Sequence, residues 1–395
     1  MSNYKVFGHH DENTLRQMED VMSRAERGVL CADGHLGYVM PIGGVAAYRN
    51  QVSVVGVGFD IGCGNMAVRL DCKTSDLPVN HVLDVVEAHI SFGIGQTNPE
   101  APRDHVLFDD PRWATYEDKH MIDQLKKLGR DQLGTVGSGN HYVDYFEDEN
   151  GNAWIGVHFG SRGLGHKTAT GFLNLSQGNP WQGRAKEVEI LLDLDSDLGA
   201  RYDDAMSLAG DYAKAGREWV CRTLAKKLQV DIVEEVHNHH NFAWKETHDG
   251  QTYVVVRKGS TPLFPGQRSF VGGSMGDNAV ILEGVDSPAS RATLHSTVHG
   301  AGRVMSRTAA AGKYKGWGKK RRKVSDGKIS WDMLNNWLAK KGVQLRGGGL
   351  DEAPQAYRRL DEVLKYHDGT YKLVHTLRPL GVVMAGEHEF DPYRD

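Results

Sequence analysis

Apolar and polar residues alternate along the chain with two different periods, which predict a mixture of helices and strands. The helical period covers residues 14–27, 79–89 and 120–127, and a long stretch over 185–228 that we expect to form two or three helices. Runs rich in β-branched residues predict strands over 51–58, 65–72, 154–158, 253–258 and 278–283, whereas the polar, basic residues 314–328 predict a loop. Glycines cluster beside histidines, so we expect an α+β fold that carries its chemistry on turns at strand ends.

Composition narrows the class of protein without identifying it. The 395 residues are 39% hydrophobic and 25% charged, as in soluble globular proteins, and the formal net charge of -4 excludes a chain that is basic throughout. No apolar run is long enough to span a bilayer, and the first residues do not resemble a signal peptide. The four cysteines form no C-x-x-C pair, which argues against a disulfide framework. We therefore expect a cytoplasmic protein without a membrane partner.

Familiar catalytic patterns are incomplete in this chain. Residues 160–165 resemble a phosphate-binding P-loop, but His166 precedes Lys167, so the required Gly-Lys junction is missing. Residues 272–276 match the G-x-S-x-G elbow of hydrolases, but a strand rather than a helix is predicted after them. These patterns therefore indicate neither a P-loop nucleotidase nor a serine hydrolase.

Side chains that bind metals occur beside glycine and asparagine rather than beside bulky residues. Asp60 and Cys63 share one glycine-rich turn, His141 follows Gly-Ser-Gly-Asn, His158 ends a predicted strand, and His240 closes a run of histidine and asparagine. One carboxylate, one thiolate and several imidazoles suit a borderline divalent ion such as Mn²⁺, Zn²⁺ or Fe²⁺. Spacing alone does not bring these segments together. The same residues also fit a small buried cysteine, core histidines and a solvated face.

A second cluster, His299-Gly300-Ala301-Gly302-Arg303, combines an imidazole with a glycine turn and a guanidinium. Imidazole can attack a phosphoryl group and form a phosphoramidate, while backbone N–H groups and the arginine hold the oxyanions. The alternative is a helix that begins with a glycine-rich turn. Residues 313–323, with their lysines, arginines, Tyr314 and Trp317, similarly fit either an RNA backbone contact or a solvated loop.

A series of sequence blocks resembles the signature blocks of the RtcB family of RNA ligases, in the family's order. They run from near the start of the chain to near its C-terminus. The blocks are DGH at 33–35, PIGGVAA at 41–47, GFDIGCG at 58–64, GTVGSGNH at 134–141, HFGSRG at 158–163, RKG at 257–259, GSMG at 273–276, HGAGR at 299–303 and DEAP at 351–354.

The resemblance implies a fold and a metal centre. It implies one α+β domain over residues 1–395, with a bifurcated mixed sheet (a pseudo-barrel) flanked by helices around a metal cleft. Two Mn²⁺ ions are expected, with Cys63 bridging them. His240 is preferred to its neighbouring histidines because His240-Asn241 matches the family's His-Asn pair. The implied ligands are Asp60, Cys63, His141, His158 and His240.

The resemblance also implies a reaction with GTP as co-substrate. His299 would attack the α-phosphate of GTP and become guanylated, GMP would pass to an RNA 3′-phosphate, and a 5′-hydroxyl would displace GMP. The RNA would start with a 2′,3′-cyclic phosphate or 3′-phosphate, in RNA repair or tRNA splicing, and the protein would act as a monomer. The residues implied to bind the nucleotide are Asn140, Asp144, Gly273, Ser274, Met275, Gly300, Ala301, Gly302, Tyr357 and Met384.

The chain departs from the family around the guanine base. Asp144 stands where the family usually has Glu, Ala279 where it often has Ser, and Met384 where a lysine usually contacts the nucleotide. The last change removes a charged hydrogen bond of about 1.5–3 kcal/mol. The alternative functions are a di-metal phosphoesterase that opens cyclic phosphates without nucleotide transfer, and a non-catalytic RNA-binding subunit. His299 distinguishes the first alternative, because a hydrolase needs no guanylated residue.

Overall fold

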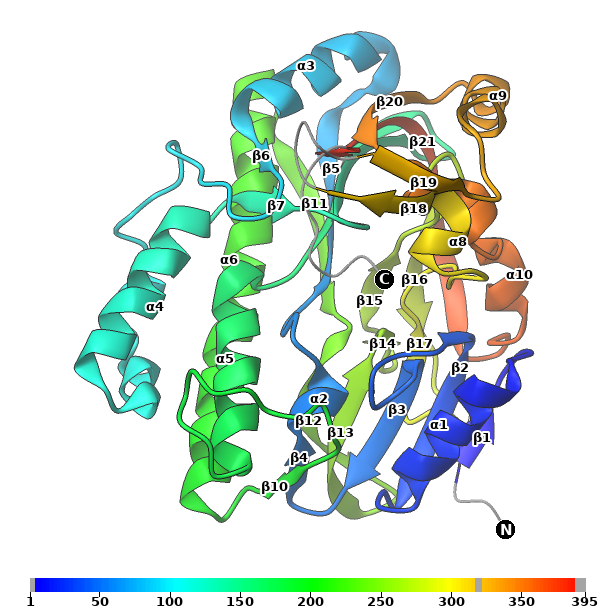
Figure 1. Cartoon of the computed structure of the whole chain (residues 1–395). Helices are drawn as coiled ribbons and strands as arrows, with labels where there is room; N and C mark the ends of the chain where they lie inside the picture. The colour runs from blue at the N-terminus through cyan, green and yellow to red at the C-terminus, as the bar shows by residue number, and fades with distance from the viewer. Residues whose placement is uncertain (1–3, 317–321, 388–395) are drawn as a thin grey trace.

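Two large β-sheets form the centre of the computed structural model, which describes residues 4–316 and 322–387 (Figure 1). The first sheet has the order β1-β2-β3-β13-β12. Only β1 and β2 run parallel; the other neighbours pair antiparallel. Its strands are β1 (Tyr4–Val6), β2 (Arg27–His35), β3 (Ile42–Tyr48), β12 (Asn241–His248) and β13 (Gln251–Lys258).

The second sheet has the order β11-β5-β9-β8-β21-β16-β15, and β20 branches from it by pairing parallel with β21. Strand β21 therefore pairs with β16 along its first half and with both β8 and β20 along its second half. The strands are β5 (Gly64–Lys73), β8 (Tyr142–Glu147), β9 (Asn152–Phe159), β11 (Ile232–His239), β15 (Arg268–Val271), β16 (Ala279–Gly284), β20 (Gln344–Gly348) and β21 (Tyr371–Gly386). This branched, nearly closed sheet confirms the predicted α+β class and the bifurcated pseudo-barrel.

Helices cover both sides of the sheets, with α4, α5 and α6 on the left in Figure 1 and α8, α9 and α10 on the right. The helices are α1 (Glu12–Met22), α2 (Val54–Val57), α3 (Val79–His89), α4 (Lys119–Gln132), α5 (Arg162–Ser176), α6 (Asp197–Leu228), α7 (Pro288–Ala292), α8 (Arg307–Ala311), α9 (Trp331–Lys341) and α10 (Leu360–Lys365). Short strand pairs fill the remaining connections: β4 (Gln51–Ser53) with β10 (Leu191–Asp193), β6 (Ser91–Phe92) with β7 (Thr135–Gly137), β14 (Ser260–Pro262) with β17 (Ser296–Val298), and β18 (Gly312–Lys315) with β19 (Arg322–Asp326).

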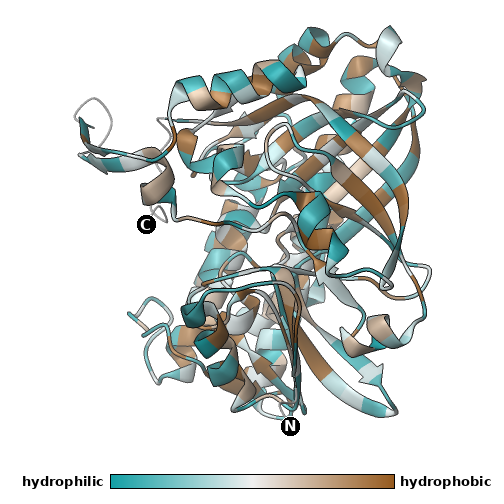
Figure 2. Cartoon of the chain, turned by 90° about the vertical axis from the view of Figure 1, so that its right-hand side faces the viewer, coloured by the Kyte–Doolittle hydropathy of each residue, from teal (hydrophilic) through white to brown (hydrophobic). Residues whose placement is uncertain are grey.

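One of several hydrophobic clusters lies between the second sheet and helix α6. Val220 and Leu224 of α6 are fully buried and belong to one hydrophobic cluster with Val68, Ile155 and Val157 of the sheet. Hydrophobic residues accordingly dominate several of the strands in Figure 2, while the helices carry hydrophilic and hydrophobic positions in turn. The long helix and the sheet thus form a rigid base for the turns at the ends of β5, β9 and β11.

Several predicted elements are confirmed with small changes in their bounds. Helix α3 has the predicted bounds, and β5, β9, β13 and β16 each cover a predicted strand. Helix α4 contains the predicted segment and extends beyond its C-terminal end, to Gln132.

Two other predicted elements end earlier than expected, one because of a tertiary pairing and one because of a local hydrogen bond. Helix α1 ends at Met22, not at Arg27, because the chain from Arg27 onward pairs with β3 as strand β2. The predicted strand over 51–58 ends at Ser53, whose hydroxyl accepts a hydrogen bond from the Gly56 N–H at 2.7 Å and starts α2. A short run of valines fits a buried helix as well as a strand, so the pattern did not separate the two.

The longest predicted helical stretch and the predicted loop also differ from the structure. Residues 185–190 are not helical, and a single helix, α6, covers 197–228. The predicted loop over 314–328 contains strands β18 and β19, which form an antiparallel hairpin. Its residues 317–321, with Trp317, lie outside the described residues. Across 4–316 and 322–387, no helix combines the length and the apolar character that crossing a membrane would require.

Candidate metal centre and nucleophile

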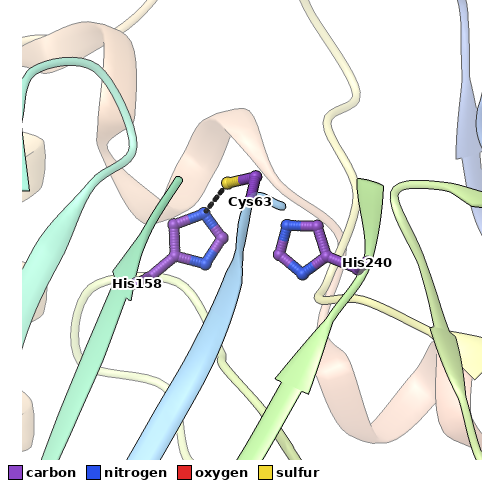
Figure 3. A group of neighbouring side chains, drawn as sticks. All are labelled: Cys63, His158 and His240. Carbon is purple, nitrogen blue, oxygen red and sulfur yellow. Dashed lines mark hydrogen bonds between the residues drawn. The ribbon is translucent and has the colours of Figure 1, made fainter. Parts of the chain in front are cut away.

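Neighbouring strands of the second sheet end at the same level and deliver the predicted ligands to one place (Figure 3). Cys63 directly precedes β5, and His158 lies near the end of β9, opposite Asn65 of β5. His240 follows β11, and its backbone N–H donates to the Cys63 carbonyl at 2.8 Å. Figure 3 shows the Cys63 thiol between the imidazoles of His158 and His240. The strand register therefore sets the spacing of these side chains.

The predicted metal-binding side chains form one connected cluster. Cys63 Sγ lies 3.6 Å from His158 Nε2 and 3.7 Å from His141 Nε2, and Asp60 Oδ2 lies 3.2 Å from the same nitrogen of His141. The rings of His158 and His240 stack with centroids 5.1 Å apart. Two overlapping sets have all their ligand atoms within 4.8 Å of one another: Cys63, His158 and His240, and Asp60, Cys63 and His141. Cys63 belongs to both sets, as a bridging ligand would.

Hydrogen bonds at the outer ring nitrogens orient two of the histidines. His158 Nδ1 lies 2.6 Å from the Asn65 side-chain oxygen, and His141 Nδ1 lies 3.0 Å from the Val136 carbonyl. Because the Asn65 oxygen accepts, the proton of His158 lies on Nδ1 and its Nε2 presents a lone pair toward Cys63. His141 Nε2 faces both Cys63 and Asp60. His240 Nδ1 is buried without a hydrogen-bond partner among the described residues. A buried, unsatisfied nitrogen in such a cluster fits a metal ligand.

The electrostatics of the cluster also suit a bound cation. Burial and the neighbouring imidazoles hold the pKa values of His158 and His240 well below the usual range, so both are neutral and can donate lone pairs. Burial and the Asp60 charge raise the pKa of the Cys63 thiol. Burial alone would raise the pKa of the Asp60 carboxyl. Its hydrogen bond to His141 and the charge of a protonated His141 outweigh burial and lower this pKa to about 2. A divalent cation would stabilise the thiolate and carboxylate together.

Glycine is required where the turns pass the ligands. A Cβ on Gly160 would lie 2.2 Å from an Asp60 carboxylate oxygen, so only glycine leaves room for that side chain. Gly62, in the Asp60–Cys63 turn, has φ +68°, which favours glycine. Its carbonyl accepts a hydrogen bond at 3.0 Å from Arg217, a fully buried residue of α6 that also donates to the Phe159 carbonyl. Arg217 thus ties the turn to the end of β9.

His299 stands beside the cluster and is held by a buried carboxylate. Its ring centroid lies 5.1 Å from that of His240. Asp33, at the end of β2 and fully buried, accepts from the His299 Nδ1 at 2.6 Å and from its backbone N–H at 3.0 Å. Burial tends to raise the pKa of Asp33, but His299 outweighs this and lowers it, through its charge when protonated and through its N–H groups, so Asp33 is an ionised acceptor also when the His299 ring is neutral. The proton therefore sits on Nδ1, and Nε2 keeps the lone pair of a nucleophile.

The glycine turn after His299 packs against the predicted nucleotide residues. Arg303 donates to the hydroxyl of Tyr357 at 2.8 Å and to Glu352 at 3.3 Å, and Tyr357 in turn hydrogen-bonds Glu352. Gly302 has φ +76°, and a Cβ there would lie 2.2 Å from the Asp33 carbonyl. Gly300 lies against Gly272, because a Cβ added to Gly300 would be 3.3 Å from the Gly272 carbonyl oxygen. The two glycine-rich turns, 272–276 and 299–303, therefore lie side by side.

The other predicted nucleotide residues line a neighbouring apolar region. One hydrophobic cluster buries Met275, Met384 and Ala353. The partly buried Tyr142 and Tyr357 pack against it. Asp144 lies on β8 with a carboxylate oxygen that is buried and unpaired within the described chain, and burial raises its pKa well above the usual range. Such a group would gain from donors on a ligand. The Ser274 hydroxyl donates a hydrogen bond to the Asp277 carboxylate at 2.8 Å. Ala301 is buried, whereas Asn140 is exposed next to His141.

The sequence did not reveal every residue that shapes the site. Asn65 orients His158, Arg217 holds the Gly62 turn, and Arg162 places its guanidinium 3.2 Å from His141 Nδ1. Asp33 belongs to the DGH block at 33–35, but its hydrogen bond to His299 was not predicted. A pairing of residues 266 positions apart leaves no local signal in the sequence.

The site therefore places a cysteine–histidine–carboxylate cluster that suits a metal ion beside a histidine that is arranged as a nucleophile would be. Residues 15–385 match the family model described as "tRNA-splicing ligase RtcB", and the chain belongs to the RtcB family. It is 31% identical to the tRNA-splicing ligase RtcB of Thermococcus kodakarensis over 90% of this chain and 86% of that protein. It is 30% identical to the RNA-splicing ligase RtcB of Escherichia coli K12 over 88% of this chain and 87% of that protein.

Proposed function

We propose that this protein joins an RNA end carrying a 2′,3′-cyclic phosphate or 3′-phosphate to a 5′-hydroxyl end, with GTP and Mn²⁺, through a guanylated His299. The observation that carries the proposal is the pairing of His299 Nδ1 with the buried Asp33 carboxylate at 2.6 Å, beside the ligand cluster. A di-metal phosphoesterase that hydrolyses with metal-activated water needs no such nucleophile. Membership of the RtcB family supports the same activity.

The proposed reaction proceeds by successive displacements at phosphorus. His299 Nε2 attacks the α-phosphorus of GTP, a phosphorus–nitrogen bond forms, and pyrophosphate leaves. Where the RNA starts as a 2′,3′-cyclic phosphate, water first attacks its phosphorus and breaks the bond to the 2′ oxygen, which leaves a 3′-phosphate. An oxygen of this 3′-phosphate then attacks the same phosphorus of the guanylate, which breaks the phosphorus–nitrogen bond and frees His299. The 5′-hydroxyl finally attacks the RNA phosphorus and releases GMP. Guanylation provides the leaving group that a bare 3′-phosphate lacks, so one difficult displacement becomes several easier ones.

Asp60, Cys63, His141, His158 and His240 would hold the metal ions in this proposal, since their neutral imidazoles, thiolate and carboxylate suit Mn²⁺. When bound, Mn²⁺ would polarise phosphate oxygens and lower the pKa of a hydroxyl. Asp33 keeps the proton on Nδ1 and steadies the positive charge that His299 gains during attack.

The nucleotide would lie over the adjoining turns. Backbone N–H groups of 300–302 and 273–275 would hold its phosphates, with Asn140 beside the metal side. Tyr357, fixed by Arg303, would contact the guanosine, and Asp144 would accept from the N1 and N2 donors of guanine. Met384 would contribute only apolar contact, which weakens the hold on the nucleotide. We further propose that the protein acts as a monomer in the cytoplasm, in RNA repair or tRNA splicing.

Labelling with GTP tests this function directly. The protein is incubated with Mn²⁺ and GTP labelled at the α-phosphate, denatured, and tested for label that is lost in acid and kept in alkali, as for a phosphoramidate. We expect such label on the wild type and none on His299→Ala. Label that persists in His299→Ala would place the nucleotide on another residue, and opening of cyclic phosphates without any label would favour a metallohydrolase.

A further inference from the structure

Three aromatic rings, of which one is exposed, lie in contact next to the cluster of predicted ligands. Tyr38 is 58% exposed, and the edge of its ring meets Phe59, with ring centroids 6.2 Å apart and planes at 86°. Phe59 in turn packs on His166, with centroids 5.6 Å apart. We call Tyr38, Phe59 and His166 the aromatic platform. Leu36, which is 54% exposed, lies on the same loop as Tyr38.

The loop that carries Tyr38 is fixed by the protein. Gln17 of α1 donates to the carbonyl of Gly37 at 2.9 Å and to that of Tyr38 at 2.7 Å, and it accepts from the Gly37 N–H at 3.0 Å. The ammonium group of Lys258 lies 5.8 Å from the centre of the Tyr38 ring and donates to the Val55 carbonyl at 3.0 Å. An isolated exposed tyrosine is ordinary, but a ring held outward at the edge of a reaction centre is prepared for a ligand.

The platform adjoins one particular end of the cluster. Phe59 directly precedes Asp60, and His166 lies one helical turn after Arg162, whose guanidinium reaches His141 at 3.2 Å. Contacts then continue from His141 to His158, from His158 to His240, and from His240 to His299. The Phe59 and His166 side of the platform thus adjoins Asp60 and His141. These two residues begin the series of contacts, and His299 is its last member.

The two RNA ends of the proposed reaction need different kinds of binding. The 3′-phosphate end carries charge and reacts with the nucleotide on His299. The 5′-hydroxyl end has no terminal phosphate, so its base and ribose are the main features near the reacting oxygen. In an in-line displacement the attacking hydroxyl approaches opposite the leaving GMP, and therefore away from His299.

We infer that the aromatic platform stacks the terminal nucleobase of the 5′-hydroxyl RNA strand, with Tyr38 as the contacting ring. This inference rests on the proposed function. Stacking on an aromatic ring accepts every base, because each has a π-face, so the platform would place the end without choosing its sequence.

The test compares Tyr38→Ala with removal of the base it is inferred to contact. Separate 3′-phosphate and 5′-hydroxyl strands are joined with the intact enzyme, and the 5′ strand carries either a normal or an abasic terminal nucleotide. With the normal strand we expect Tyr38→Ala to lower kcat/KM by about five- to a hundredfold, chiefly through KM for the 5′ strand. With the abasic strand the same substitution should have little further effect, and Tyr38→Trp should preserve joining of the normal strand. Tyr366→Ala, at another partly exposed tyrosine, is the matched control.

Two independent measurements keep this inference separate from the proposed function. Labelling of His299 uses no RNA and should be unchanged in Tyr38→Ala. Binding of a 5′-hydroxyl strand with terminal 2-aminopurine should quench its fluorescence in the wild type and much less in Tyr38→Ala, without any turnover. Equal quenching in both proteins, or a Tyr38→Ala loss that persists on the abasic strand, would overturn the inference. Absence of wild-type label would overturn the proposed function alone.

Discussion

Replacing Asp33 by Asn removes a buried charge from the nucleophile while keeping the shape of the side chain. In the structure one Asp33 oxygen accepts from the His299 Nδ1 at 2.6 Å, from its backbone N–H at 3.0 Å and from the Gly300 N–H at 3.4 Å. A hydrogen bond to a charged group is worth about 1.5–3 kcal/mol. At about 1.4 kcal/mol per tenfold change in rate, Asp33→Asn should slow guanylation of His299 by about 10- to 150-fold.

Single-turnover labelling with α-labelled GTP measures this rate, since no RNA is needed. Thermal unfolding of the same samples shows whether the variant is folded. Asp148→Asn is the matched control, because Asp148 is also buried and accepts from Trp154 at 3.0 Å, at the opposite end of the β8–β9 pair from His158. A wild-type labelling rate in Asp33→Asn would refute the argument that this carboxylate sets the tautomer of His299.

The remaining predictions concern the metal, the nucleotide and pH. Mn²⁺ at 100 times its Kd should stabilise the wild type by about 2.7 kcal/mol in thermal unfolding and Cys63→Ala by far less; equal shifts would exclude this cluster as the Mn²⁺ site. Met384→Lys should restore a charged hydrogen bond and lower the Kd for GTP about tenfold in a titration, and an unchanged Kd would place the nucleotide elsewhere. Burial lowers the pKa of His367 to about 4 from its usual 6.5. Between these pH values the unfolded chain binds more protons than the folded protein, so the free energy of unfolding falls as the pH drops from 6.5 toward 4. His367→Gln should remove about 2 kcal/mol of the loss between pH 7 and pH 5, measured by urea unfolding; an identical pH profile would contradict the assigned cause.

The sequence predicted the ligand cluster better than it predicted the strands and helices. Asp60, Cys63 and His141 were recognisable because glycine turns leave a distinctive pattern around them, and the structure brings them together with His158 and His240. Their roles as ligands stay a prediction. Local periodicity failed where tertiary pairing decided the outcome, as at Arg27, which the pairing of β2 with β3 draws out of the predicted helix.

Contacts between distant segments were out of reach for a different reason. Arg217 is one of several charged residues on a long helix, and nothing in its neighbourhood shows that its guanidinium reaches the carbonyls of Gly62 and Phe159. Gln17 likewise looks like a surface residue of α1, although its amide fixes the Tyr38 loop. Such roles depend on which elements pack together, and no periodic pattern records that.

The bond between Asp33 and His299 joins residues that leave the ribosome far apart in time. Strand β2 is made early, whereas the turn that holds His299 and the strand β21 beside β8 are made near the end of synthesis. A growing chain therefore holds the Asp33 carboxylate and the turn at 60–63 long before His299 is added. If His299 is the guanylated residue, fragments that stop before residue 299 should take up no label from GTP, whatever metal they bind.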